Sequence, residues 1–357
     1  MANPLSLVTS LPSIADTVDL LVKIAGRPLD AAIAASVLDV SVQQTLGQPS
    51  HLTLRLAAWD PDTDQFTLVD DPRLQPGSSV EVELGFLSQR KPVFWGEIVG
   101  LDFDANASDR AVVTINAYDI LHRLGRGERQ AKYEKTTYAG IVRTIAQTIY
   151  KIAVDARDDL DNDPENPVVF QENKSDFAFL TKLAMEIQYE LFVDAGDKKL
   201  VFRKSQLTAP VSLTLDARQD LVQFSARLDA AGQLGGVEVR SFDSDNKKRI
   251  QVVLDNPDSL DRRYGSAPSR SLITDLPLLT QEEAQAHAEA ELLRIRANYL
   301  TATATCFGRT ELRPGLMIHI AELGDRFGGD FHVTAATHSL SPSGGFRTSF
   351  KLEGVTR

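Results

Sequence analysis

Short stretches in which apolar and polar residues alternate dominate the chain from about residue 38 to residue 118. In "HLTLRL" three leucines share one face, and in "SSVEVELGF" valines and a leucine alternate with glutamates. This period of two residues is typical of strands with one buried face. Turn signals such as Asp60-Pro61 and Pro76-Gly77 separate the stretches. The pattern therefore predicts an all-β barrel or sandwich in this region.

Helical spacing replaces the alternation after about residue 120. The stretch "TTYAGIVRTIAQTIYKI" places isoleucines at 141, 145, 149 and 152. A second helix is expected to begin after Ser175, a suitable N-cap, with Asp176 in its first turn. A hairpin with strands "YELFV" and "KLVF" follows. Residues 121–206 are therefore expected to form a small α+β domain.

Two segments far apart in the chain carry nearly the same pattern. Residues 73–85 read "RLQPGSSVEVELG", and residues 311–324 read "ELRPGLMIHIAELG". Each has a leucine two residues before Pro-Gly, then alternating apolar residues, then a Phe near a Gly in "FWGEI" or "RFGGDF". Pro presets the turn and Gly accepts a positive φ. The echo indicates two related β-barrel domains, although Pro-Gly turns also recur by chance in β proteins.

The expected fold class is mainly β with α+β parts, and the second barrel is split by an insert. Thr280 and Glu283 form a capping-box pattern that begins a helix in this insert. A trimer of such chains would present six similar barrels, so it could meet a six-fold partner on one face and a three-fold partner on the other. The expected domains are a first barrel with an N-terminal extension at 1–120, the α+β domain at 121–206, the second barrel at 207–245 and 300–357, and the insert at 246–299.

Charge and cysteine content narrow the classes of function. The formal net charge of −11, from 38 basic and 49 acidic side chains, argues against non-specific binding to nucleic acid. Cys306 is the only cysteine, so an intrachain disulfide is excluded. The start "MANPLSLVTSLPS" lacks a signal-peptide pattern, and no apolar run approaches a membrane span. Synthesis in the cytoplasm is therefore expected.

The sequence contains few residues in patterns that are typical of catalysis or metal binding. His319, His332 and His338 lie on or near the final strands, and His332 and His338 are expected to share a strand face. A metal site there is conceivable, but polar residues on the wetter side of a barrel explain them better. "DPDTDQ" imitates the start of a calcium loop without the required glycine. No catalytic residue, metal ligand or cofactor is expected.

The acidic run at 155–163 has two readings. A charge run is most simply a solvated loop, and the alternative is a contact surface for a partner.

The stretch "VFQENKSDFAFLTKLAMEIQYELFVDAGDKKLVF" resembles the corresponding region of the phage late control gene D proteins. It is also similar to the N-terminal hub part of the VgrG spike proteins of type VI secretion. Those families carry a Gln, an acidic residue, then Ser/Thr-Asp-Phe-x-Phe-Leu at the start of a helix. The matching positions are Gln171, Glu172, Ser175, Asp176, Phe177, Phe179 and Leu180. The two Pro-Gly segments look like the two halves of the family, and their motif residues are Pro76, Gly77, Gly96, Pro314, Gly315 and Gly328.

This resemblance implies a baseplate hub, a structural protein of a phage tail or other contractile injection system. A homotrimer would form a pseudo-hexameric ring that joins the hexameric tail tube to a trimeric central spike. The chain ends after the second barrel, unlike VgrG, so the spike is expected to be a separate protein. Other implied partners are tail tube or tube-initiator proteins and baseplate wedge proteins. Specific nucleic-acid binding is not implied, although the bore of such a ring is a route for cargo or DNA.

The implied location is the tail baseplate of a virion or injection particle, reached after synthesis in the cytoplasm. A different class of function is a tail-associated cell-wall hydrolase, which needs paired carboxylates in a cleft or a metal site. The abundance of acidic residues leaves this alternative open. A module that binds glycans through exposed aromatic residues is a third class, and an aromatic content of 7% gives it little support.

Overall fold

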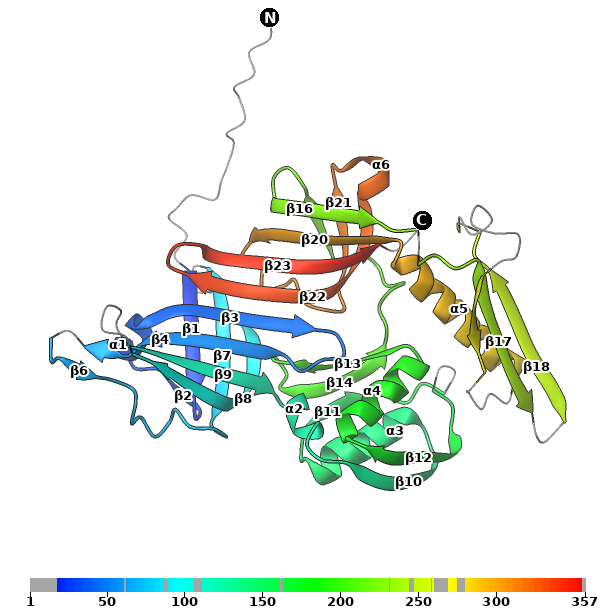
Figure 1. The fold of residues 1–357 in the computed structure, drawn as a ribbon, viewed down its shortest axis with the longest axis horizontal. Coiled ribbons are helices and arrows are strands. Elements are labelled where there is room, and N and C mark those ends of the chain that lie inside the picture. The colour runs from blue at the N-terminus through cyan, green and yellow to red at the C-terminus, as the bar shows by residue number, and fades with distance from the viewer. Residues whose placement is uncertain are drawn as a thin grey trace, which may run out of the picture.

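The computed structural model describes residues 18–60, 62–86, 89–105, 111–160, 163–230, 232–243, 247–257, 259, 269–274 and 280–354. Most of the N-terminal extension expected from the sequence therefore lies outside the described residues. A 13-stranded sheet is the main element, and smaller sheets and helices flank it (Figure 1). The expected class, mainly β with α+β parts, is confirmed.

The first half of the large sheet is formed by residues 18–119 and is called here the first β unit. Its strands are β1 (Val18–Ile24), β2 (Arg27–Pro28), β3 (Val37–Thr45), β4 (His51–Ala57), β7 (Ser79–Phe86), β8 (Lys91–Asp104) and β9 (Val112–Asp119). The order in the sheet is β3-β4-β9-β8-β7-β1-β2. Helix α1 (Ala31–Ala35) and the small hairpin β5 (Trp59–Asp60) and β6 (Gln65–Phe66) lie beside it. The alternating Val, Leu and Ile residues of these strands form one buried cluster.

The second half of the sheet, called the second β unit, is formed by residues 213–228 and 300–354. Its strands are β15 (Leu213–Asp216), β16 (Leu221–Leu228), β20 (Leu300–Phe307), β21 (Met317–Ala321), β22 (Gly329–Ser341) and β23 (Gly345–Gly354), with α6 (Gly324–Phe327). Their order is β16-β20-β23-β22-β21-β15. This repeats the order of the first unit, with β15 in the place of β1. One difference is that β1 is antiparallel to β7 whereas β15 is parallel to β21.

The small α+β region lies between the two units in sequence. Its elements are α2 (Leu121–Leu124), β10 (Arg129–Thr136), α3 (Tyr138–Arg143), a π-helical segment (Thr144–Ile149), β11 (Val154–Ala156), β12 (Asn166–Lys174), α4 (Asp176–Glu186), β13 (Tyr189–Asp194) and β14 (Lys199–Lys204). Ile141 and Ile145 are buried as the helical spacing predicts, but Ile149 is exposed. The wider π-turn adds residues to each turn, so the apolar face drifts.

The insert begins earlier than the sequence indicated. Its elements are β17 (Gly236–Asp243), β18 (Lys248–Asp255), β19 (Arg270–Ile273) and α5 (Gln281–Ala297). The stretch at 235–243 was expected in the second barrel, but β17 pairs with β18 and β19 instead. One face of this sheet packs on α5 through residues such as Val239 and Ala288. The capping box of Thr280 and Glu283 is confirmed, with reciprocal bonds of 3.1 and 3.2 Å.

The acidic run at 155–163 is packed into the structure only in part, and residues 161–162 lie outside the described residues. The Asp163 carboxylate accepts hydrogen bonds from the backbone N–H groups of Tyr138 at 2.8 Å and Ala139 at 2.7 Å, at the start of α3. Asp163 is fully buried, and this burial raises its pKa. Tyr189 donates to Asp159 at 3.2 Å. The expectation of a solvated loop was therefore wrong for Asp159 and Asp163, whose carboxylates anchor local elements, whereas Asp158 and Leu160 are exposed as expected.

A membrane-spanning helix is not found among the described helices, none of which combines the required length with an apolar sequence.

Candidate functional site

The two Pro-Gly turns have the same backbone structure. In the first unit the N–H of Gly77 donates to the Ile98 carbonyl at 2.8 Å, and in the second the N–H of Gly315 donates to the Val333 carbonyl at 2.8 Å. Gly77 has φ +93° and Gly315 has φ +82°, in the region that favours glycine. The echo in the sequence therefore reports a repeated structural element.

The repeat extends to the irregularities of the strands. Val99 is the residue of β8 that β9 skips in pairing, and Thr334 is the residue of β22 that β23 skips. Leu38 of β3 and Val222 of β16 are skipped in the same way by β4 and β20. Bulges of this kind alter strand direction at fixed positions. Their coincidence shows that the two β units share one detailed architecture.

The structure separates two glycines that the sequence pattern had aligned. Because Ile98 matches Val333, Gly96 matches Phe331 and not Gly328. A Cβ at Gly96 would collide with the backbone carbonyl of Tyr118 in the neighbouring strand. Gly328 instead ends α6, where a Cβ would lie 2.9 Å from the Gly324 carbonyl. The two residues therefore serve different local needs.

The second Pro-Gly turn contacts a buried polar cluster that the sequence did not reveal. Glu190 of β13, which is 5% exposed, lies 3.1 Å from Arg203 Nη2 through Oε2 and 3.2 Å from His332 Nε2 through Oε1. Arg203 also donates to the Gly315 carbonyl at 3.4 Å. Burial disfavours the Glu190 carboxylate, but the close contact with His332 and the charge of Arg203 outweigh it and lower the pKa of Glu190. The cluster ties the α+β region to the second unit.

Two polar residues of the family motif meet inside the α+β region. Gln171 Nε2 donates to Asp176 Oδ1 at 2.8 Å, and Tyr150 donates to Asp176 Oδ2 at 2.7 Å. Arg129 Nη2 lies 3.1 Å from the same oxygen of Asp176. Burial and Asp176 raise the pKa of Tyr150 to about 12. This network links β10, β12, α4 and the residue after the π-helical segment, so its role is structural.

The remaining residues of that motif begin and pack α4. Ser175 is the N-cap, as predicted, and its hydroxyl accepts from the Ala178 N–H at 3.2 Å. Phe179 and Leu180 are buried in the cluster of the α+β region, and the half-buried Phe177 packs against it.

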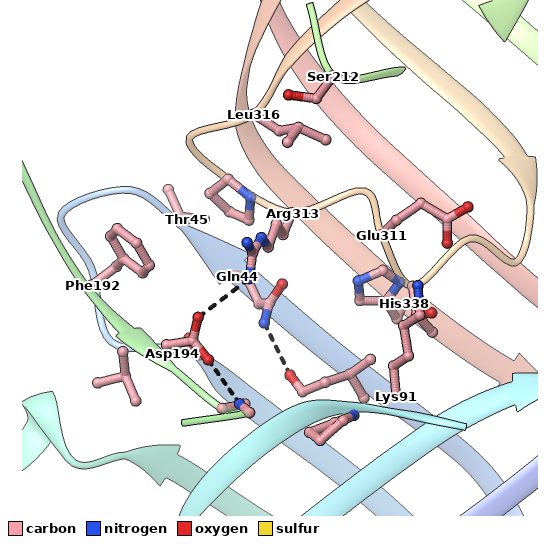
Figure 2. Close-up of a pocket in the computed structure, with 18 of the residues that line it drawn as sticks. Gln44, Thr45, Lys91, Phe192, Asp194, Ser212, Glu311, Arg313, Leu316 and His338 are labelled. Atoms are coloured by element: carbon pink, nitrogen blue, oxygen red, sulfur yellow. Dashed lines mark hydrogen bonds and ion pairs between the residues drawn. The ribbon is translucent and has the colours of Figure 1, made fainter. Parts of the chain in front are cut away.

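A cavity of about 440 Å³ lies where the two β units meet the hairpin β13–β14 (Figure 2). Asp194 in the hairpin pairs with Arg313 at 3.2 Å, and Gln44 donates to the Val93 carbonyl at 2.9 Å. The hairpin also reaches the first unit through Lys198 and Glu81, at 2.6 Å. These contacts make the hairpin a bridge between the two units. Residues that line the cavity include Lys91, Pro92, Val93, Phe192, Ser212, Leu213, Glu311, Pro314, Leu316 and His338.

The histidines are not brought together. His338 lies on the core face of β22, where burial lowers its pKa to about 4, and His332 faces Glu190 on the opposite side. The expected shared face was wrong, because the bulge at Thr334 reverses the alternation between them. His319 pairs with Asp330 at 2.6 Å near the surface. Among the described residues, no group of three His, Cys, Asp or Glu side chains could hold a metal ion.

The two β units are joined by hydrogen-bonded pairing between one strand of each. β3 of the first unit pairs antiparallel with residues 335–340 of β22, so that Ala336 lies opposite Gln44 and His338 lies opposite Val42. Phe346 of β23 packs into the core of the first unit. This joint makes a single sheet of two similar halves.

The positions that match this joint elsewhere in the chain have no partner at the corresponding edge among the described strands. Residues 100–104 of β8 match 335–339 of β22, and of the described strands only β9 pairs with them. Leu101 and Phe103 are 37% and 46% exposed there, whereas the matching residues Ala336 and His338 are each 1% exposed. β16, which matches β3, pairs only with β20 among the described strands. One chain therefore carries, in β8 and in β16, the two open edges that a second joint of the same kind requires.

The fold is similar to that of known tail proteins. A tail protein from Neisseria meningitidis MC58 matches with a TM-score of 0.72 and 16% identity, over 94% of this chain and 96% of that one. The 43 kDa tail protein of prophage MuSo2 from Shewanella oneidensis matches with a TM-score of 0.70 and 14% identity, over 94% and 98%. The E. coli c3393 protein, described as a component of the type VI secretion system, matches with a TM-score of 0.61 and 15% identity, over 94% and 77%. At these identities the likeness is one of fold.

No curated protein matches the chain in sequence. The model of a family described as the Alg8 N-terminal domain matches residues 14–342, which is nearly the whole chain. The chain therefore belongs to the Alg8 N-terminal domain family.

Proposed function

We propose that the chain is a structural baseplate hub of a contractile tail or a related injection system. Three copies form a pseudo-hexameric ring that joins the hexameric tail tube to a trimeric central spike. The resemblance of the Gln171–Leu180 motif to late control gene D and VgrG proteins supports this proposal. The fold shared with two phage tail proteins and with the type VI component c3393 also supports it.

The observation that carries the proposal is the duplicated β unit with its unpaired edges. The two units repeat the same strand order and have two bulges at matching positions, and the edge of one unit is joined to β22 of the other. A joint of this kind is head-to-tail, and head-to-tail contacts close into rings when the rotation allows. Three copies with two units each give six similar units, which suits partners of six-fold and three-fold symmetry.

The partners in this proposal are a separate spike protein, tail tube or tube-initiator proteins and baseplate wedge proteins, in the baseplate of a virion or injection particle. The net charge of −11 suits a bore that does not retain nucleic acid in transit. We keep the domains at 1–120 and 121–206 as part of the proposal, and we move β17 from the second barrel, expected at 207–245 and 300–357, to the insert, expected at 246–299.

The proposal assigns no catalysis to the chain. The buried carboxylates of Asp163, Asp176 and Glu190 are each engaged by backbone N–H groups or by side chains that position secondary structure. A cell-wall digestion assay is expected to show no turnover. Turnover that is abolished by a single carboxylate substitution would favour the hydrolase alternative.

The ring is tested by measuring the mass of the purified chain, alone and after mixing with a candidate spike protein from the same tail or injection system. Trimers are expected in at least the mixed sample, and electron micrographs of them are expected to show rings with six lobes. A strictly monomeric chain in both samples would overturn the proposed function.

A further inference from the structure

The unpaired edges of β8 and β16 fit each other when they come from two copies of the chain. We propose that β16 of one copy pairs antiparallel with residues 100–104 of β8 in the next copy. This contact repeats, between chains, the joint that β3 and β22 make within one chain. The inference rests on the proposed ring and names the surfaces that close it.

The equivalence of β8 and β22 is fixed by their common neighbours. Leu101 lies opposite Ile115 of β9, and Ala336 lies opposite Phe350 of β23. Leu101 lies three residues after Ile98, and Ala336 lies three residues after Val333. The carbonyls of Ile98 and Val333 are the ones that accept hydrogen bonds from the two Pro-Gly turns. Leu101 therefore matches Ala336, and by the same count Phe103 matches His338.

The equivalence of β16 and β3 is fixed by their bulges. The skipped residues are Val222 in β16 and Leu38 in β3, and both precede a run of regular pairing. Counting on from them, Ala226 matches Val42 and Leu228 matches Gln44. Both strands present the edge opposite β20 or β4, and in β3 that edge is taken by β22.

The register of the joint between copies follows from the register of the joint within the chain. Because Ala336 lies opposite Gln44, Leu101 is placed opposite Leu228 of the next copy. The next core pair places Phe103 opposite Ala226. The second of these pairs sets a large residue against a small one, and the pairing covers Leu101 and Phe103, which are exposed in one chain.

The intervening residues face the other side of the sheet and are complementary in charge. This register places Asp102 directly opposite Arg227, where the joint within the chain has the uncharged pair Thr337 and Gln43. In the single chain Arg227 is 77% exposed and pairs with Asp229 at 2.6 Å, and Asp102 accepts from Asn116 at 2.7 Å. Opposite charges across neighbouring strands favour one register and disfavour others.

A cysteine pair tests the register directly. Directly opposite residues on one sheet face have Cβ atoms about 5 Å apart, within reach of a disulfide after small adjustment. Asp102→Cys combined with Arg227→Cys is expected to give interchain disulfides under mild oxidation, up to a covalent trimer. The native Cys306 is buried, and burial raises its pKa to about 12, so it does not compete.

The matched control moves one cysteine along the same strand face. Asp104→Cys with Arg227→Cys puts the two cysteines two residues out of register, so that their positions lie about 7 to 8 Å apart, too far for a disulfide without backbone movement. This control is expected to give little or no disulfide under the same conditions. Equal cross-linking of the two pairs would overturn the register.

Charge reversal tests the pairing without cysteines. Asp102→Arg and Arg227→Asp are each expected to raise the concentration needed for half-assembly about tenfold, because like charges then face each other. The double variant restores an opposite pair at every joint and is expected to assemble like the unaltered chain. Thermal unfolding of each variant at a concentration where it is monomeric serves as the control for folding.

The outcomes separate this inference from the function on which it rests. A trimeric sample without the interchain disulfide means that another surface covers β8, which overturns the joint and leaves the ring standing. Failure of the double charge variant to recover has the same meaning. A chain that stays monomeric alone and with the spike protein overturns the proposed function itself.

Discussion

The two Pro-Gly turns share a backbone and differ in what surrounds them. A Cβ placed on Gly77 would meet no atom within 4 Å, whereas one placed on Gly315 would lie 2.8 Å from Glu190 Oε2 and 2.9 Å from Arg203 Nη2. The first turn is an open loop end, and the second is a docking point for the α+β region. The two copies thus share the turn, but only the second lies against Glu190 and Arg203.

A similar contrast occurs at the strand ends that follow. In the first unit Gly96 lies opposite the buried Asp119, and in the second Phe331 lies opposite Gly354. Asp119 accepts from the N–H groups of Ser50 at 2.7 Å and Leu121 at 2.9 Å, at the entry to the α+β region. The first unit therefore contacts the α+β region through Asp119, at the end of its own strand β9. The second unit contacts that region through the Glu190 cluster.

The largest expected effect comes from removing the charge at the docking point. Glu190→Gln removes a buried carboxylate and leaves the buried His332 and the partly exposed Arg203 without their anionic partner. The free energy of unfolding is expected to fall by about 3 kcal/mol, measured by urea denaturation. A matched control is Glu83→Gln, whose carboxylate is in a half-exposed pair with Lys23 and is expected to cost about 0.5 kcal/mol. Equal losses would mean that the cluster does not hold the α+β region.

The pH dependence of stability is expected to distinguish the two carboxylates. Burial raises the pKa of Asp119 to about 6, so the folded chain retains a proton that the unfolded chain loses near pH 4. The associated stabilisation is present below pH 4 and is lost as the pH rises to 6, by about 2 to 3 kcal/mol. The measurement is the difference in unfolding free energy between the unaltered chain and Asp119→Asn, from pH 4 to pH 7.

The pKa of Glu190 is lowered, so its contribution has the opposite sign. It is present above the ordinary pKa of a glutamate and is lost as the pH falls through the lowered value. The Glu190→Gln difference should therefore shrink toward acid, whereas the Asp119→Asn difference should change in the opposite sense. Parallel pH profiles for the two variants would contradict this assignment.

Substituting alanine for Gly77 and for Gly315 tests the difference between the two Pro-Gly turns directly. Both replace a residue at positive φ, which costs about 1 kcal/mol in each turn. At Gly315 the new methyl group must also displace Glu190 and Arg203, so Gly315→Ala is expected to lose about 2 kcal/mol in total. Urea denaturation of both variants checks the difference. An equal loss of unfolding free energy in the two variants would show that Glu190 and Arg203 move away from the new methyl group at no energetic cost.

The smallest effect is expected at the bridging hairpin. Arg313→Ala and Lys198→Ala each remove a partly exposed ion pair, with Asp194 and with Glu81. Each is expected to lower the unfolding free energy by about 0.5 kcal/mol at low salt, and the loss should vanish near 1 M salt. Thermal unfolding at two salt concentrations measures this. A loss that persists at high salt would indicate packing rather than charge.

Local features of the fold could be predicted because their causes are local. The N-cap of Ser175, the capping box of Thr280 and the positive φ of Gly77 and Gly315 depend only on neighbours within a few residues. The alternation of buried and exposed residues along the strands of the first unit is equally local. The candidate site was predicted in part, since both copies of the Pro-Gly strand were recognised but not the joint between the units.

Pairing partners could not be predicted because they depend on distant residues. The stretch at 235–243 has a strand pattern that fits a barrel as well as the insert, and only its pairing with β18 decides between them. The bulge at Thr334 is invisible in the alternation, yet it places His332 and His338 on opposite faces. The same applies to Glu190, which reads as one acidic residue in a strand until His332 and Arg203 surround it.

The sequence by itself determined the mainly β class, the repeat and the positions of turns and helix starts, because backbone preferences and side-chain period act within a few residues. The tertiary structure alone decided which strands pair, which copy of the turn is docked and which edges stay unpaired. Strand pairing and burial join residues that are hundreds of positions apart, as β3 and β22 are. No local pattern of apolar and polar residues encodes such partners.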